Sequence, residues 1–242
     1  MIQVSEISIP DYVHGFPDVA FGGYVAGLLA KRSGAPRVRV DFRAKVPVGE
    51  PIVLASPRSG AHTLTGADGT LLAEASPAVL RIDPPPVPSW ADAHDAAAAQ
   101  LPSGSRRVTD CYGCGTACAP GRGLLLHPCA AADRELTVAA WSPHPALAGA
   151  DGQLPPEVVW AALDCPGGWA AITWQGMRPG SVTAALTATQ LRPVLAGAQY
   201  ISYAWPIHRE GRKFTVGVGL ATASGELCAL AEALWIQPEH LA

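Results

Sequence analysis

The chain has 242 residues, of which 49% are hydrophobic and 15% are charged, as in a folded protein with a substantial core. Its net charge is -3 and its 17 Lys and Arg are dispersed, which argues against a nucleic-acid partner. The sequence has no apolar run near the ~20 residues of a membrane span and no signal-peptide pattern at its start, so we expect a cytoplasmic protein without a membrane partner.

The first half of the chain reads as one strand, one helix and then a series of strands. Alternating side chains predict a strand over residues 2–9, and a helix is predicted from Gly22 through the small, apolar run that ends at Ala30. Two glycines at a helix start disfavour the helix, so we expect a close approach to the backbone there. Either a carbonyl or phosphate oxygen binds the first N–H groups or, the alternative that this stretch alone favours, the helix packs tightly on a sheet. Turn residues then separate four predicted strands: residues 37–44, 50–57, 61–67 and 71–82.

A proline-rich segment follows the first half. It begins at Asp83, contains an alanine-rich stretch typical of a helix, and closes on a Pro/Gly/Ser run at Ser105. This composition predicts a linker with one short helix. We therefore divide the chain into a first repeat over residues 1–88, a linker over 89–106 and a second repeat over 107–242.

The second half repeats the order of the first. A strand is predicted at residues 135–142, and a helix from Pro155 to Asp164. Four strands follow: residues 181–191, 198–208, 214–223 and 226–237.

The two halves also align with each other. Residues 21–35 fall on residues 154–168 without a gap, which places these pairs opposite one another: Gly22 and Pro155, Gly23 and Pro156, Lys31 and Asp164. Residues 43–52 fall on residues 191–200, with Gly49 opposite Gly197. Such self-similarity indicates an internal duplication, in which each half wraps an antiparallel sheet around its own helix.

These motifs resemble a known family. The segments VAFGGYVAGLL and FRAKVPVGEPI look like the first half of double hot-dog acyl-CoA thioesterases of the thioesterase II type, and VVWAALDCPGG resembles their acid-bearing helix. The resemblance implies an α+β fold of two tandem hot-dog repeats with their sheets joined edge to edge. It also implies hydrolysis of an acyl-CoA or carrier-bound acyl thioester without a metal or an organic cofactor. Hot-dog sheets commonly pair through exposed edges, which is compatible with a homo-oligomer.

Asp164 is the main catalytic candidate. It lies about two turns into an otherwise apolar helix, where a carboxylate must be paired, reached by solvent or used. Because Lys31 is its counterpart, the acid occurs in one half only, and one carboxylate suffices as a general base for water. The alternative is a helix-end Asp bonded by local N–H groups, since the Cys-Pro-Gly-Gly that follows is expected to end the helix. Glu157, in the first turn, is expected to complement the helix dipole.

Hydrolysis also needs groups that hold the water and the carbonyl oxygen. Alternation along residues 181–191 predicts Thr183, Thr187 and Thr189 on one face of the strand. The resemblance implies a catalytic hydroxyl at Thr187 or Thr189, and a carbonyl oxygen bound by N–H groups at the helix start, around Gly23. Three further residues are candidates for substrate contact: Gly22, Tyr24 and Trp160.

One departure from the thioesterase pattern concerns the last long strand. The family has a Gln there, whereas this chain has Ala231 at the corresponding place, beside Glu232. Either Glu232 or Gln190 substitutes for that amide, or the site works differently. The missing amide also suggests an alternative function, a non-catalytic acyl-CoA-binding protein.

His14 suggests a second kind of enzyme. A His in the first half and an Asp in the second half form the acid–base pair of double hot-dog dehydratases, so His14 and Asp164 are an alternative pair. The dehydratase pattern has a proline directly before the helix glycine, where this chain has Phe21. A lone His in a loop is most often a surface or hydrogen-bonded residue.

The six cysteines are expected to be thiols or ligands rather than a disulfide framework. Four of them, with His127, have spacing that would suit zinc: Cys111, Cys114, Cys118 and Cys129. The alternative, which we favour for these residues, is a cluster of reduced thiols. Cys165 directly follows Asp164, but no His lies close to it in sequence, which argues against a nucleophilic thiolate.

Overall fold

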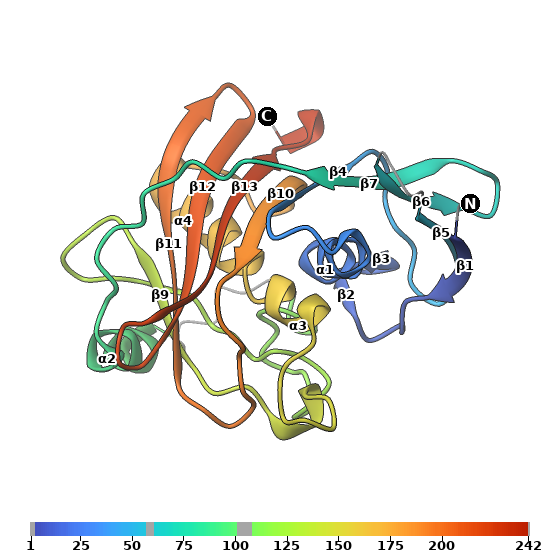
Figure 1. Ribbon diagram of the computed structural model, residues 1–242. Helices are drawn as coiled ribbons and strands as arrows, with labels where there is room; N and C mark the ends of the chain where they lie inside the picture. The colour runs from blue at the N-terminus through green and yellow to red at the C-terminus, as the bar shows by residue number, and fades with distance from the viewer. Residues whose placement is uncertain (1–2, 57–60, 101–107, 242) are drawn as a thin grey trace.

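One antiparallel sheet forms the frame of the molecule (Figure 1). The computed structural model describes residues 3–56, 61–100 and 108–241. Within these residues the sheet has 11 strands, in the order β1-β5-β6-β7-β4-β10-β13-β12-β11-β9-β8. The first half contributes β1 (Gln3–Ser8), β4 (Val38–Phe42), β5 (Pro51–Ser56), β6 (His62–Gly66) and β7 (Leu71–Pro77). The second contributes β8 (Cys129–Ala130), β9 (Thr137–Trp141), β10 (Val182–Gln190), β11 (Tyr200–Glu210), β12 (Lys213–Thr222) and β13 (Leu227–Ile236).

The two halves of the sheet meet at β4 and β10. These strands pair antiparallel, with Val40 opposite Leu186 and Arg39 opposite Thr187. In β4 buried side chains alternate with partly buried ones, whereas β10 is buried without a break from Ala185 to Thr189. The prediction that the two sheets join edge to edge is confirmed.

The helix α1 (Gly22–Ser33) begins at the paired glycines, as predicted, and packs on β4, β6 and β7. Its glycines allow a second helix, α3 (Pro156–Ala161), to lie directly against it (Figure 1). A Cβ at Gly23 would lie 2.8 Å from the Ala161 Cα, and a Cβ at Gly27 would overlap the Glu157 Cα. The close approach expected at the glycines is therefore the approach of one helix backbone to another.

The second half departs from the prediction after α3. The Cys-Pro-Gly-Gly sequence does not end the helical region; it begins a new helix, α4 (Cys165–Gln175). Pro166 is tolerated in the first turn of a helix because N–H groups there have no partner inside the helix. Gly168 lets α4 approach the sheet, since a Cβ there would lie 2.8 Å from the Trp235 ring. The first helix does end, at Ala161 and thus before Asp164, which was predicted to lie within it; the sequence missed the second helix, whose glycines are used by this contact with the sheet.

The linker contains the expected helix, α2 (Trp90–Gln100), which packs on β9 at the side of the molecule away from α1 (Figure 1). Ala93 of α2 is fully buried in a small cluster with Val138 and Ile201. Residues 101–106 of the predicted linker lie outside the described residues, so the division into repeats at 1–88 and 107–242 stays a prediction. A separate two-stranded sheet, β2 (His14–Phe16) and β3 (Val19–Ala20), leads into α1.

The internal duplication is visible in the turns. Gly49 and Gly197, which the alignment places opposite one another, have φ of 72° and 76°. Gly69 and Gly225, in the turns before the last strand of each half, have φ of 82° and 88°. Left-handed backbone of this kind favours glycine, which explains why glycine occupies both copies of each turn.

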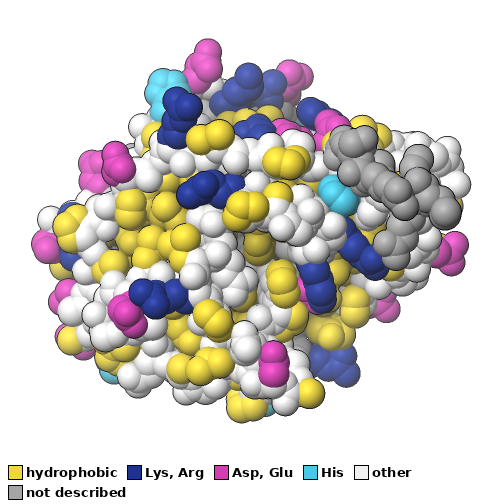
Figure 2. Space-filling view, in the orientation of Figure 1, with side chains coloured by type: hydrophobic (Ala, Val, Ile, Leu, Met, Phe, Trp, Pro, Cys, Tyr) yellow, Lys and Arg dark blue, Asp and Glu magenta, His cyan; other side chains and the backbone are white. Residues whose placement is uncertain are grey.

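The distribution of charged side chains on the surface and the character of the helices agree with what the composition predicted. In the face that Figure 2 shows, Lys and Arg side chains lie in several separate places among hydrophobic ones. None of the helices in the described part of the chain combines the length and the apolar character that crossing a bilayer requires.

The contact between α1 and α3 predicts an unusual response to alanine. In an ordinary helix, Gly→Ala raises stability by roughly 1 kcal/mol. Gly27→Ala should instead lower the free energy of unfolding by about 1–3 kcal/mol, because its Cβ overlaps the Glu157 backbone. Chemical denaturation measures this, with the exposed Arg32→Ala on the same helix as a control that changes it by at most about 0.5 kcal/mol. A stabilised Gly27→Ala protein would contradict the close packing.

Candidate functional site

Asp164 lies at the break between α3 and α4, outside both helices. The residue is 2% exposed. The Thr183 hydroxyl donates a hydrogen bond to Oδ1 over 2.6 Å, and the Gly23 N–H donates one to Oδ2 over 2.7 Å. Although Asp164 is the residue before α4, its side chain makes no capping bond to that helix. The alternative of an Asp bonded by local N–H groups is therefore wrong, because both donors come from distant elements.

The environment of Asp164 suits a proton-accepting carboxylate. Burial, the largest cause, raises its pKa from 3.8 to about 6. The hydrogen bonds from Thr183 and Gly23 lower the pKa in part, and the nearby Cys114 raises it. A base is most effective when its pKa lies near the working pH, so this carboxylate can remain ionised at neutral pH and still accept a proton.

The two glycines at the start of α1 have distinct roles in this arrangement. A Cβ at Gly22 would lie 3.2 Å from Asp164 Oδ2 and 3.5 Å from the Thr183 side chain. A Cβ at Gly23 would lie 2.7 Å from the Asp164 Cβ. Glycine is thus needed for α1 to reach the carboxylate. The Gly23 N–H, predicted to hold a carbonyl oxygen, is bonded to Asp164 in this structure.

Thr183 is the hydroxyl that the structure brings to Asp164, and a β-bulge explains why. Opposite β13, Thr183 pairs with Trp235 while Ala185 pairs with Leu234, so Ala184 is an extra residue. The bulge reverses the alternation, which places Thr183 on the face of the helices and Thr187 on the opposite face. The prediction that all three threonines share one face was wrong.

The two threonines that the sequence favoured lie apart from the carboxylate's hydrogen bonds. Thr189 is buried, and its hydroxyl donates to the Pro36 carbonyl over 2.8 Å. Thr187 is buried beside Arg39 and Glu232, which are its partners on the neighbouring strands.

Neither suggested substitute for the missing amide reaches Asp164. Glu232 pairs with Thr187 across β10 and β13, on the face away from the helices. The Gln190 amide donates to the Arg192 carbonyl over 3.1 Å at the exposed end of its strand. Ala231 pairs with Ala188 on the helix-facing side, where its methyl group has no hydrogen-bonding capacity.

His14 is held by its own surroundings. Its Nδ1 donates to the Asp11 carbonyl over 2.8 Å, and its Nε2 lies 3.2 Å from Asp110 Oδ2. Both ring nitrogens are therefore directed at loop residues, and the structure brings His14 into no hydrogen bond with Asp164.

The two aromatic candidates for substrate contact occupy different environments. Tyr24 is partly buried and packs edge-on against Tyr112, with ring centroids 5.8 Å apart; burial raises its pKa to about 12, so it remains a neutral phenol. Trp160 is 4% exposed within the main core. Phe21, directly before Gly22, also packs on Tyr112. Aromatic rings thus cover the start of α1.

A pocket of about 420 Å³ is formed by residues of the second half. Its lining includes Leu124, Leu125, Trp141, Ser142 and His144, and Asp164 does not line it. The Asp164 carboxylate is instead buried, and the residue is 2% exposed.

The duplication produces a second position equivalent to this site, and it carries different chemistry. Lys31 stands where the alignment has Asp164, and its Nζ lies 3.3 Å from Glu157 Oε1. Pro156, opposite Gly23, has no N–H to donate. Only one of the two equivalent positions therefore combines an acid with an N–H donor.

The comparisons with known proteins establish the fold. No protein-family model matches the chain, and no curated protein matches its sequence. The structure is similar to that of the tesB protein of Mycobacterium avium subs paratuberculosis, at 13% identity and a TM-score of 0.61, over 98% of this chain and 93% of that chain. It is also similar to the acyl-CoA thioesterase II TesB2 of Mycobacterium marinum, at 13% identity and a TM-score of 0.59, over 98% and 94%. The prediction of an α+β double hot-dog fold is confirmed.

The raised pKa of Asp164 predicts a pH-dependent cost in stability. The folded carboxyl holds its proton more tightly than the unfolded one, so its ionisation between about pH 4 and pH 6 destabilises the native state. Asp164→Asn keeps an oxygen for the Gly23 N–H and removes the charge. The variant should therefore become more stable than the parent as pH rises, by up to about 3 kcal/mol at pH 7.

Denaturation curves of both proteins from pH 4 to pH 8 test this prediction. The exposed Glu135→Gln serves as the control that removes a charge without burial. A stability difference between Asp164→Asn and the parent that shrinks with rising pH would contradict it.

Proposed function

We propose that this protein is a thioester hydrolase that acts on acyl-CoA or carrier-bound acyl thioesters, with Asp164 as the general base. The observation that carries the proposal is the buried carboxylate held by Thr183 and Gly23 where the two halves meet. The fold supports it, because similar structures include a protein named as an acyl-CoA thioesterase II.

The proposed reaction uses one water molecule and no covalent intermediate. Asp164 takes a proton from the water as its oxygen attacks the thioester carbonyl carbon, and a tetrahedral intermediate forms. The carbon–sulfur bond then breaks, the thiolate accepts the proton from Asp164, and a carboxylic acid and a thiol are released. Thr183 keeps the carboxylate in place throughout.

The negative charge on the carbonyl oxygen needs donors. We assign this role to the N–H groups at the start of α1 other than that of Gly23, which donates to Asp164, since the first N–H groups of a helix have no acceptor within it. Gly22 lies against Asp164 there and leaves room that a side chain would fill. Because Asp164 is 2% exposed, the proposal requires that its surroundings open for the thioester to reach it.

Substitutions at the carboxylate and its hydroxyl partner test the mechanism. Asp164→Asn should lower kcat for the best acyl-CoA substrate by about 10²–10⁴-fold, because the base is lost. Thr183→Val should lower kcat by roughly tenfold, since one hydrogen bond to the carboxylate is lost. A thiol-release assay across short, long and aromatic acyl-CoAs measures both.

Thr65→Val on β6 makes the same hydroxyl-to-methyl change in a strand remote in sequence from Asp164, and should leave kcat unchanged. Thr189→Val separates the structure from the sequence-based expectation. If it abolished turnover while Thr183→Val did not, the hydroxyl assignment would be wrong.

A non-catalytic acyl-CoA-binding protein is the second candidate. It is favoured by the enclosure of Asp164, by the hydrogen bonds that both of its oxygens already accept, and by Ala231 in place of the family's amide. This function predicts that the parent binds acyl-CoA in calorimetry yet releases no thiol from any thioester of the panel.

A dehydratase that used His14 with Asp164 would lose its turnover in a His14→Ala variant, whereas the proposed thioesterase should not. Because His14 is bonded to Asp11 and faces Asp110, His14→Ala should leave thioester hydrolysis within about threefold of the parent, as a substitution outside the site does. Thiol release measures this. Loss of hydrolysis in a folded His14→Ala protein would show that His14 takes part in the reaction.

A further inference from the structure

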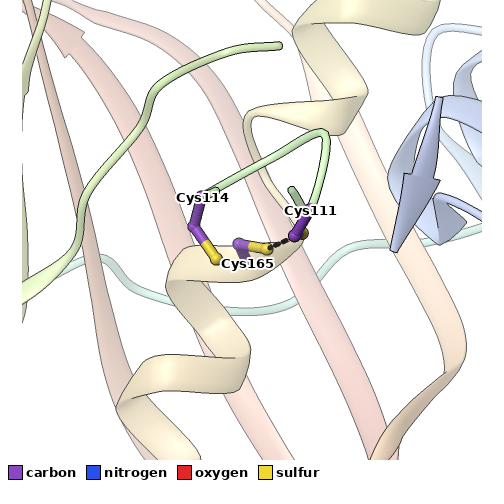
Figure 3. A group of neighbouring side chains, drawn as sticks. All are labelled: Cys111, Cys114 and Cys165. Carbon is purple, nitrogen blue, oxygen red and sulfur yellow. Dashed lines mark hydrogen bonds between the residues drawn. The ribbon is translucent and has the colours of Figure 1, made fainter. Parts of the chain in front are cut away.

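Three cysteine side chains from two distant segments converge on one another (Figure 3). Cys111 and Cys114 belong to one turn, and Cys165 is the first residue of α4. Their sulfur atoms all lie within 4.8 Å of one another, and all three residues are buried. The thioesterase mechanism uses none of these thiols.

The spacing of the sulfur atoms suits a tetrahedral metal ion. Cys111 Sγ lies 3.8 Å from Cys165 Sγ. With a zinc–sulfur bond of about 2.3 Å, two ligands of a tetrahedron have sulfur atoms about 3.8 Å apart. A disulfide would require about 2.05 Å.

The turn that carries two of the thiols is narrow. The Gly115 N–H donates to the Cys111 carbonyl over 2.7 Å. A Cβ at Gly115 would lie 2.6 Å from the Cys111 nitrogen, so only glycine fits there. The Cys-x-x-Cys-Gly sequence therefore builds a turn that presents both sulfur atoms to one point.

A hydrogen-bond donor from α4 is directed at one of the three sulfur atoms. The Trp169 indole Nε1–H donates to Cys114 Sγ over 3.4 Å. Donors of this kind stabilise sulfur that carries negative charge, and they orient metal ligands.

We propose that Cys111, Cys114 and Cys165 bind one Zn²⁺ ion in tetrahedral geometry, with a water molecule as the fourth ligand. Thiolates select soft or borderline ions, and Zn²⁺ takes four ligands without requiring redox chemistry. The ion ties the Cys111–Cys114 turn to the first residue of α4, and so holds the backbone beside Asp164. This proposal stands on the positions of the three sulfur atoms and does not rest on the proposed hydrolysis.

This ligand set differs from the one that the sequence suggested. Cys118 donates its thiol to the Cys111 carbonyl over 3.4 Å, and Cys129 donates to the His127 carbonyl over 3.5 Å. Neither belongs to the three-thiol group, and Cys165 takes their place. The proposal also replaces our sequence-based expectation of a protein without metal.

The test uses the full chain, reduced and freed of metal, and titrated with Zn²⁺ against a coloured chelator. The parent should bind one ion per chain. Cys165→Ser and Cys111→Ser should bind it on the order of 100-fold more weakly. Cys228→Ser is the matched control, since Cys228 is a buried thiol on β13 that donates to the Glu226 carbonyl, and it should bind like the parent.

Titration of the unaltered chain with Co²⁺ keeps the test independent of how the variants fold. A thiolate-to-cobalt charge-transfer band of an intensity that indicates three thiolates, displaced by Zn²⁺, supports the site. The proposal is overturned if the reduced parent binds no Zn²⁺, if Cys165→Ser binds as well as Cys228→Ser, or if the isolated chain contains a disulfide among the three cysteines and no metal.

Discussion

The contact between α1 and α3 is the constraint on which the rest of this structure depends. Gly23 and Gly27 remove the side chains that would separate the two helices, so their backbones approach each other directly. This approach brings a helix-start N–H from the first half to a carboxylate of the second half, over 2.7 Å. Substituting either glycine would push the two helices apart, and so separate the two halves of the candidate site, although it would alter none of the site's functional groups.

The buried carboxylate of Asp164 lowers the stability of the native state, although it suits the proposed chemistry. Burial raises the pKa of Asp164 to about 6, so the native state loses stability when the group ionises. Two hydrogen bonds offset part of this cost. A fold has no structural need for such a group at a helix break, since an amide would make similar hydrogen bonds without the charge. Buried groups of this kind are concentrated at functional sites.

Duplication and divergence explain why the site is single. The two repeats share turn glycines with matching left-handed backbone, which indicates a common plan. Their equivalent helix positions have nonetheless become different. Lys31 forms an ion pair with Glu157 where the other half has its buried acid, and Pro156 cannot donate where Gly23 does. One repeat thus supplies the N–H donor and the other supplies the carboxylate.

The sequence alone determined the features that depend on local patterns. Strand alternation and turn residues predicted the succession of the main strands along the chain, the start of α1 at Gly22 and a carboxylate at Asp164 among apolar neighbours, because each is encoded within a few neighbouring residues. The tertiary structure decided the rest. A bulge in β10 directs Thr183, and not Thr187, to the face on which Asp164 lies. The glycines after Asp164 pack on Trp235 and belong to a second helix, α4. The fold also brings Cys165 close to Cys111. These outcomes depend on contacts between residues far apart in the chain, and no local pattern in the sequence predicts such contacts.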